Sequence, residues 1–259
     1  MMLSSVSLRE SQRNASYTNR SMHREYRKWW SPVLGRDMEL LVFGHGGRPV
    51  IVFPTAAGRF FDWEDRGMIA ALADGLESGS LQLFCVDSVD GESWLNRKIP
   101  ASDREARHNR YESYLIEEML PFVKSLNPAH RFSTAGCGLG GYHALNFALK
   151  HPHLVDLCLS MGGTFDIRHY LNGQRDSNAY FNNPVAFLPL LTDQAILDEY
   201  CHNVRFILAT GERDMCLDDS LQMAGIMHEK RIPHTLDIWG SHAGHDWEWW
   251  QQMARKFLV

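Results

Sequence analysis

A glycine-rich turn near the middle of the chain most constrains the fold, because it has two incompatible interpretations. The turn reads Gly136-Cys137-Gly138-Leu139-Gly140-Gly141 and lies between an apolar, strand-like run and a segment of helical period. As G-x-G-x-x-G, it would place the pyrophosphate of a dinucleotide at a helix N-terminus. As G-x-S-x-G, it would present a nucleophilic side chain at the end of a strand, but glycine stands where the serine belongs. Both interpretations require a strand, a sharp turn and a helix.

Short apolar runs alternate along the chain with longer segments of helical period. This alternation is typical of a mostly parallel sheet flanked by helices, so we predict an α/β fold with about eight strands. The predicted strands are residues 25–30, 39–43, 49–53, 81–86, 131–135, 154–161, 204–209 and 235–239. The predicted helices are residues 67–76, 107–125, 142–150, 218–230 and 247–259. We expect Pro121 to kink or end the second helix.

Composition and charge exclude several classes of protein. A hydrophobic content of 44% and a net charge of -5 are those of an ordinary soluble protein with no basic field for nucleic acid. We find neither a signal peptide nor a run of about 18 apolar residues that would cross a membrane. The five cysteines form no C-x-x-C pair, which favours free thiols, a reducing compartment and a cytoplasmic location.

The chain is predicted to form one domain. Residues 1–20 are rich in Ser, Asn and Arg and are expected to be a loosely ordered tail, and residues 21–259 to form the α/β domain. Residues 163–203 interrupt the alternation, with Asn172-Gly173 and a short helix at 193–200. They are expected to be an insertion near the site, either a pocket wall or lid or a plain surface loop. Assembly into a homo-oligomer stays open.

The dinucleotide interpretation lacks its acidic partner. A Rossmann site needs a carboxylate at the carboxyl end of the following strand to bind the ribose hydroxyls. That strand ends in Leu159-Ser160-Met161-Gly162-Gly163, and Asp156 stands at its beginning instead. We therefore disfavour a dinucleotide-binding protein, which would show saturable NAD binding, and expect no cofactor.

The hydrolase interpretation finds its partners in the expected order. It requires an acid after a later strand and a histidine after the last one. Asp214 follows the strand at 204–209, and His245 follows the strand at 235–239. The carboxyl ends of parallel strands meet at one edge of a sheet, so these side chains can converge on the turn. Glu212 and Asp218 stay as alternative acids.

Several further motifs resemble one known family. They are Tyr26…Trp30-Ser31-Pro32-Val33-Leu34-Gly35, Phe53-Pro54-Thr55, Asp87-Ser88-Val89-Asp90…Ser93-Trp94 and His245-Asp246-Trp247…Trp250. Together they resemble the "putative esterase" family of the α/β-hydrolases, near esterase D and the antigen 85 mycolyltransferases, over roughly residues 23–259. The family motif G-C-S-x-G-G-Y-H-A appears here as Gly136-Cys137-Gly138-Leu139-Gly140-Gly141-Tyr142-His143-Ala144. The chain departs from the family at the position of the nucleophile.

The resemblance implies a role for each matching residue. His245 corresponds to the general base and Asp214 to the acid that orients it. The backbone N–H groups of Leu139 and Ala56 correspond to the oxyanion hole. Gly138 is the vacated nucleophile position.

Loops at the same edge supply candidate pocket residues. The predicted substrate contacts are Arg59, Phe60, Trp94 and Trp247. Cys137 should point toward the sheet interior rather than replace the nucleophile, and His143 should pack or cap. His242 and His245 form an H-x-x-H pair without a third ligand, so no metal site is predicted.

The sequence predicts a carboxylesterase-type hydrolase that is inactive or very weak, because no acyl-enzyme can form without an Oγ at Gly138. Its ligand is expected to be a small ester or acyl compound. The alternative is a natural, non-catalytic protein that binds a ligand or partner through the retained pocket. The sequence leaves open whether the glycine is natural or engineered.

Overall fold

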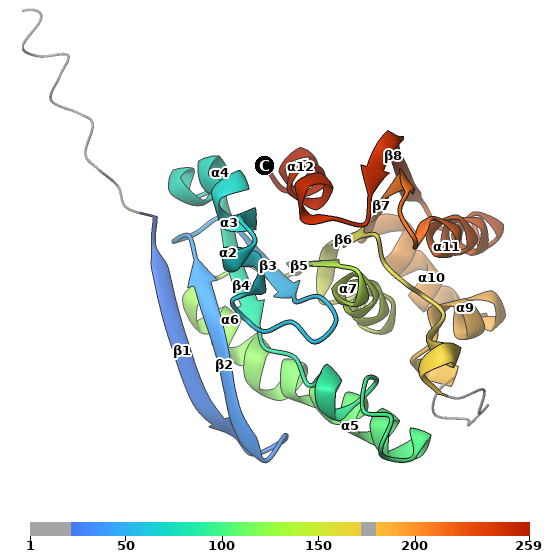
Figure 1. Ribbon diagram of the computed structural model, residues 1–259, viewed down its shortest axis with the longest axis horizontal. Helices are drawn as coiled ribbons and strands as arrows, with labels where there is room; N and C mark the ends of the chain where they lie inside the picture. Colours follow the sequence, from blue (N-terminus) through green and yellow to red (C-terminus); the bar gives the residue numbers. More distant parts are fainter. Residues whose placement is uncertain (1–21, 172–179) are drawn as a thin grey trace, which may run out of the picture.

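The computed structural model describes residues 22–171 and 180–259, and all eight predicted strands lie in one sheet. The strand order is β1-β2-β4-β3-β5-β6-β7-β8 (Figure 1). The strands are β1 (Arg24–Ser31), β2 (Arg36–Phe43), β3 (Arg48–Phe53), β4 (Leu81–Val86), β5 (Phe132–Cys137), β6 (Val155–Met161), β7 (Arg205–Arg213) and β8 (His234–Gly244). β1 and β2 pair antiparallel with each other, as do β2 and β4, whereas the strands from β4 through β3 to β8 pair in parallel.

Burial along the strands follows their place in the sheet. Every residue of the central strands β4 and β5 is buried, because helices cover both faces there. β1 and β8, at the two edges, carry mostly exposed or half-buried side chains. The apolar runs in the sequence therefore mark the centre of the sheet, and the mixed runs mark its edges.

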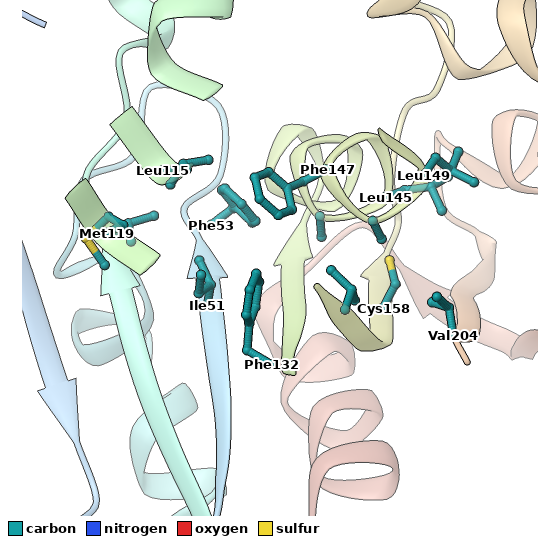
Figure 2. Close-up of a cluster of buried hydrophobic side chains, with 14 of the residues drawn as sticks. Ile51, Phe53, Leu115, Met119, Phe132, Leu145, Phe147, Leu149, Cys158 and Val204 are labelled. Carbon is teal, nitrogen blue, oxygen red and sulfur yellow. The ribbon is translucent and has the colours of Figure 1, made fainter. Parts of the chain in front are cut away.

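Two layers of helices cover the sheet. On one face lie α2 (Asp62–Asp65), α3 (Met68–Ala71), α4 (Ala73–Ser78) and α12 (Trp247–Leu258). The other face carries α5 (Ala101–Tyr114), α6 (Leu120–Leu126), α7 (Leu139–Lys150), α9 (Pro184–Phe187), α10 (Gln194–His202) and α11 (Leu217–Glu229). Figure 2 shows Leu145 and Phe147 of α7 packing toward Ile51, Phe132 and Cys158 of the sheet. The predicted helix at 67–76 is divided at Leu72 into α3 and α4.

The long helix at 107–125 begins earlier than predicted and contains an irregular turn. Five residues, Leu115–Met119, form a π-helical segment between α5 and α6. Pro121 lies in the first turn of α6, and the helix continues beyond it to Leu126. A π-helical turn leaves room for a proline ring and its missing N–H. The chain thus accommodates Pro121 without ending the helix there.

Among the described residues of the insertion between β6 and β7, the elements other than α10 are short. They are the 3-10 turns Ile167–Tyr170 and Leu188–Leu190 and the helix α9. α10 confirms the helix predicted at 193–200, whereas Asn172-Gly173 and the tail at 1–20 lie outside the described residues. Among the described residues, no helix is both long enough and apolar enough to cross a membrane.

Candidate active site

The glycine-rich turn connects β5 to α7 at the carboxyl edge of the sheet. Gly138 stands at its apex with φ of 57° and ψ of -121°, a conformation that is strained for a residue with a Cβ. A Cβ on Gly136 would lie 2.2 Å from the Gly140 carbonyl oxygen, and one on Gly140 would lie 2.4 Å from that of Pro54. The flanking glycines therefore allow β5 and α7 to pack closely. This packing explains the repeated glycines without a bound dinucleotide.

The carboxylate that a dinucleotide would require lies elsewhere. Asp156 is at the beginning of β6, where its Oδ1 accepts a hydrogen bond of 2.7 Å from the Ser133 hydroxyl. The beginning of a parallel strand is at the opposite edge of the sheet from the Gly138 turn. This placement gives no support to the dinucleotide interpretation.

Asp214 and His245, from two distant loops, form a hydrogen-bonded pair. Asp214 follows β7, His245 follows β8, and the distance from His245 Nδ1 to Asp214 Oδ1 is 2.8 Å. The Asp214 side chain is fully buried, whereas that of His245 is 25% exposed. Because an ionised carboxylate only accepts hydrogen bonds, Nδ1 is the donor and Nε2 of the neutral ring is free to accept a proton.

The free nitrogen of His245 faces the apex of the turn. A Cβ built on Gly138 would lie 3.3 Å from His245 Nε2 and 3.6 Å from Cε1. The structure therefore brings together Gly138, Asp214 and His245 in the arrangement that the sequence order predicted. Neither Glu212 nor Asp218 is the partner of His245. His242 is exposed on β8.

The backbone on the two sides of the pair fixes its position. The Cys216 N–H donates to Asp214 Oδ1 over 2.8 Å. Gly162, with φ of 55°, lies so close that an added Cβ would be 2.5 Å from Asp214 Oδ2 and 3.1 Å from His245 Nδ1. Sequence reasoning missed this role, although Gly162-Gly163 at the end of a buried strand was a visible signal. Only a residue without a side chain fits beside the Asp214–His245 pair.

The two amides expected in the oxyanion hole come from the start of α7 and from the loop after β3. Leu139 is the first residue of α7, where backbone N–H groups have no partner within the helix. Ala56 lies exposed in the loop after β3, next to Ala57 with its positive φ of 58°. Asp62 Oδ2 accepts hydrogen bonds from Thr55 N–H and Oγ1, at 3.0 and 2.8 Å, and so anchors that loop. The participation of both amides in an oxyanion hole stays a proposal.

Arg59, predicted as a substrate contact, is instead held by two carboxylates. Its Nε donates to Asp87 Oδ1 and its Nη2 to Glu39 Oε2, each over 2.6 Å. Burial raises the pKa of the Asp87 carboxyl, and the nearby Arg59 guanidinium opposes that rise. Arg59 therefore links the loop that contains Ala56 both to β2 and to the end of β4.

Replacing Arg59 with methionine is expected to destabilise the fold by about 1–2 kcal/mol, because the buried Asp87 loses its nearest cation. The estimate is modest because Arg59 is 40% exposed and Arg36 lies 3.8 Å from Asp87. Urea unfolding measures the loss. Arg168→Met is the matched control, since the Arg168–Asp166 pair is local and its arginine is 57% exposed. Equal losses in the two variants would contradict the anchoring role.

The three predicted aromatic contacts have different surroundings. Trp94 is fully buried, with its ring centroid 4.7 Å from that of His108. This burial removes Trp94 from the substrate contacts, because a loop aromatic has folded into the interior. Phe60 is half-buried and packs on Tyr26 and Phe61, with centroids 5.8 and 5.0 Å away. Trp247 is half-buried in the first turn of α12, and both remain proposed pocket residues.

Neighbouring polar residues have structural roles. Asp246, directly after His245, accepts a hydrogen bond from the Trp247 N–H and caps α12. His143 is buried and its Nε2 lies 2.8 Å from Asp90 Oδ1, consistent with the predicted packing role. Cys137 is buried in the core on the α12 side of the sheet, and this burial raises the pKa of its thiol well above the usual value. A substitute thiolate nucleophile is therefore unsupported.

Within residues 22–171 and 180–259, one group of metal-ligating residue types includes the Asp214–His245 pair. Single donor atoms of Asp214, Cys216 and His245 lie within 4.8 Å of one another. Burial, with the charges of Asp214 and Asp219, raises the pKa of the Cys216 thiol to about 12. Asp214 Oδ1 and His245 Nδ1 already hydrogen-bond to each other over 2.8 Å, so we interpret these residues as a hydrogen-bonded pair.

Comparison with known proteins identifies the family. The family described as "Putative esterase" matches residues 31–256, and the chain belongs to that family. The fold resembles that of a ferulic acid esterase with a TM-score of 0.74 and 17% identity, covering 92% of this chain and 97% of the other. It also resembles an S-formylglutathione hydrolase from Staphylococcus aureus, with a TM-score of 0.70, 16% identity and coverage of 92% and 96%.

A third structure, an S-formylglutathione hydrolase from Agrobacterium tumefaciens, gives a TM-score of 0.69 at 15% identity, with coverage of 92% and 94%. At these identities the structural likeness shows the fold alone, which is the α/β-hydrolase fold. A comparison with curated protein sequences gives no match.

Proposed function

We propose that this protein is an esterase-type hydrolase scaffold that binds a carboxylic ester or acyl compound and turns it over very slowly or not at all. The observation that carries the proposal is the orientation of the His245 ring. Its Nε2 faces Gly138, while its Nδ1 is hydrogen-bonded to Asp214. In this proposal His245 is the base, Asp214 is the acid that orients it, and Gly138 stands where the nucleophile would be. Family membership supports the ester as the ligand class.

The residual reaction uses water in place of the serine. A water molecule between Gly138 and His245 gives a proton to Nε2 and attacks the ester carbonyl carbon. The Leu139 and Ala56 N–H groups stabilise the oxyanion that forms. When the tetrahedral intermediate collapses, His245 returns the proton to the departing alkoxide, and the products are an acid and an alcohol. Enzymes that lack one triad member retain roughly 10³–10⁴-fold acceleration over water.

A second function, ligand binding without turnover, is favoured by the conformation of the apex. With φ at 57°, Gly138 avoids the strain that any side chain would introduce. The glycine thus favours a stable turn beside the Asp214–His245 pair over a strained turn that carries a nucleophile. The five free cysteines support a reducing, cytoplasmic location for either function.

The unaltered protein is expected to resist covalent labelling by a fluorophosphonate, because it has no activated hydroxyl at residue 138. Intact-mass measurement checks this, and stoichiometric labelling would reveal another nucleophile and defeat the proposal. Turnover of p-nitrophenyl acetate should show no burst and should fall further in His245→Ala. Binding of the ester with no turnover above the His245→Ala rate would favour the second function.

A further inference from the structure

Two buried polar atoms beside the candidate site have no hydrogen-bond partner. They are Asp214 Oδ2, the carboxylate oxygen that does not contact His245, and the indole Nε1 of Trp250. The Asp214 side chain is fully buried, and Trp250 is only 3% exposed. A buried carboxylate oxygen without a donor is costly, as is a buried N–H without an acceptor. One of these atoms can only accept and the other can only donate.

The two atoms border the same small region. A Cβ built on Gly162 would lie 2.5 Å from Asp214 Oδ2 and 3.2 Å from Trp250 Nε1. Because Gly162 has no side chain, nothing from that residue separates the acceptor from the donor. The indole also packs edge-on against the His245 ring, with centroids 4.7 Å apart and an interplanar angle of 84°. Trp250 therefore contacts one member of the pair and adjoins the other.

We propose that Trp250 is a positioning residue, whose indole N–H donates to one water molecule that in turn donates to Asp214 Oδ2. Oδ1 is already occupied by His245 Nδ1 and the Cys216 N–H. A donor at Oδ2 fixes the rotation of the carboxylate and so keeps Oδ1 aimed at His245. It also offsets the cost of burying the Asp214 charge.

The position of Trp250 on its helix follows from the local sequence. α12 begins at Trp247, directly after His245 and its capping neighbour Asp246. Trp250 is one turn into that helix, on the face that packs against the sheet with Met253 and Ala254. The helix that follows the base thus carries the donor for the acid. This role goes beyond the packing of Trp250 against the sheet.

The first test requires no turnover and compares the unaltered chain with its Asp214→Asn variant. With ¹⁵N-labelled tryptophan, the Trp250 indole N–H resonance should move, and its exchange with solvent should quicken, when Asp214 is replaced by asparagine. Trp239 provides the internal control, because its Nε1 donates to Asp237 over 2.7 Å and should be unaffected. A Trp250 resonance that stays in place while Asp214→Asn remains folded would overturn the proposal.

The second test rests on the proposed function and uses an active background. In the Gly138→Ser variant, adding Trp250→Phe keeps an aromatic ring but removes the N–H. We expect kcat to fall about tenfold with KM unchanged, because a hydrogen bond to a charged group is lost without altering the pocket. Unchanged kcat would overturn the positioning role. If Gly138→Ser is itself inactive, the proposed function fails, and the resonance measurement still decides the role of Trp250.

Discussion

Replacing Gly138 with serine is expected to create a working esterase. The new Cβ would lie 3.3 Å from His245 Nε2, so an Oγ attached to it can reach hydrogen-bond distance of the base after a small adjustment. Turnover of p-nitrophenyl acetate should rise roughly 10³-fold or more over that of the unaltered chain, with a burst of acyl-enzyme formation. A fluorophosphonate should label the variant at residue 138.

Gly138→Ala is the matched control for this result. It introduces the same Cβ and the same backbone strain but no hydroxyl, so it should remain as slow as the unaltered chain. Both variants should lose about 1–2 kcal/mol of unfolding free energy, because a side chain at φ of 57° is strained. A well-folded Gly138→Ser variant with no gain in turnover would show that the assignment of Asp214 and His245 as acid and base is wrong.

Replacing Gly162 with alanine is expected to disrupt the Asp214–His245 pair. The added Cβ would lie 2.5 Å from Asp214 Oδ2, which real side chains do not tolerate, so the carboxylate or the strand must move. Combined with Gly138→Ser, the change should remove at least about 100-fold of the gained activity, since the imidazole loses its orienting partner. Unfolding free energy should fall by about 3 kcal/mol, from backbone strain and overpacking together.

Gly35→Ala separates these two contributions. Gly35 also has a positive φ, of 65°, but a Cβ there meets nothing within 4 Å. This variant should lose only about 1 kcal/mol, the backbone contribution, and should leave esterase activity unchanged in the Gly138→Ser background. If Gly162→Ala lowered the unfolding free energy and the activity no more than Gly35→Ala does, the close approach at Gly162 would not matter for stability or activity.

The sequence was sufficient to predict the strands and the proximity of Asp214 and His245 in the candidate site. Buried strands appear as apolar runs, and chain order alone placed Asp214 and His245 at one edge of the sheet. The sequence did not reveal which partners some side chains contact. Arg59 appeared free for a substrate, because its carboxylates come from two other strands. Trp94 appeared to be a loop residue, because sequence does not show which way a loop folds over the core.

Other features depend on distances that no pattern encodes. The role of Gly162 follows from the 2.5 Å that would separate an added Cβ from Asp214 Oδ2, and the absence of a partner for Trp250 Nε1 follows from the packing of α12. The π-helical turn before Pro121 reflects a shift in backbone hydrogen bonding rather than a residue preference. Such features arise when residues that are distant in the sequence pack together, so a three-dimensional structure is needed to find them.

The residues of the candidate site reach one another on three independently anchored connections, after β5, β7 and β8. A chain without a nucleophile on the first connection still keeps Asp214 and His245 in contact, because the hydrogen bonds of this pair do not involve Gly138. Such a scaffold can therefore lose its nucleophile without losing its fold or the arrangement of the other two residues. On the proposed function, a single substitution at residue 138 would convert an inactive protein into a catalyst or the reverse, and a lineage could change in either direction without first rebuilding the Asp214–His245 pair.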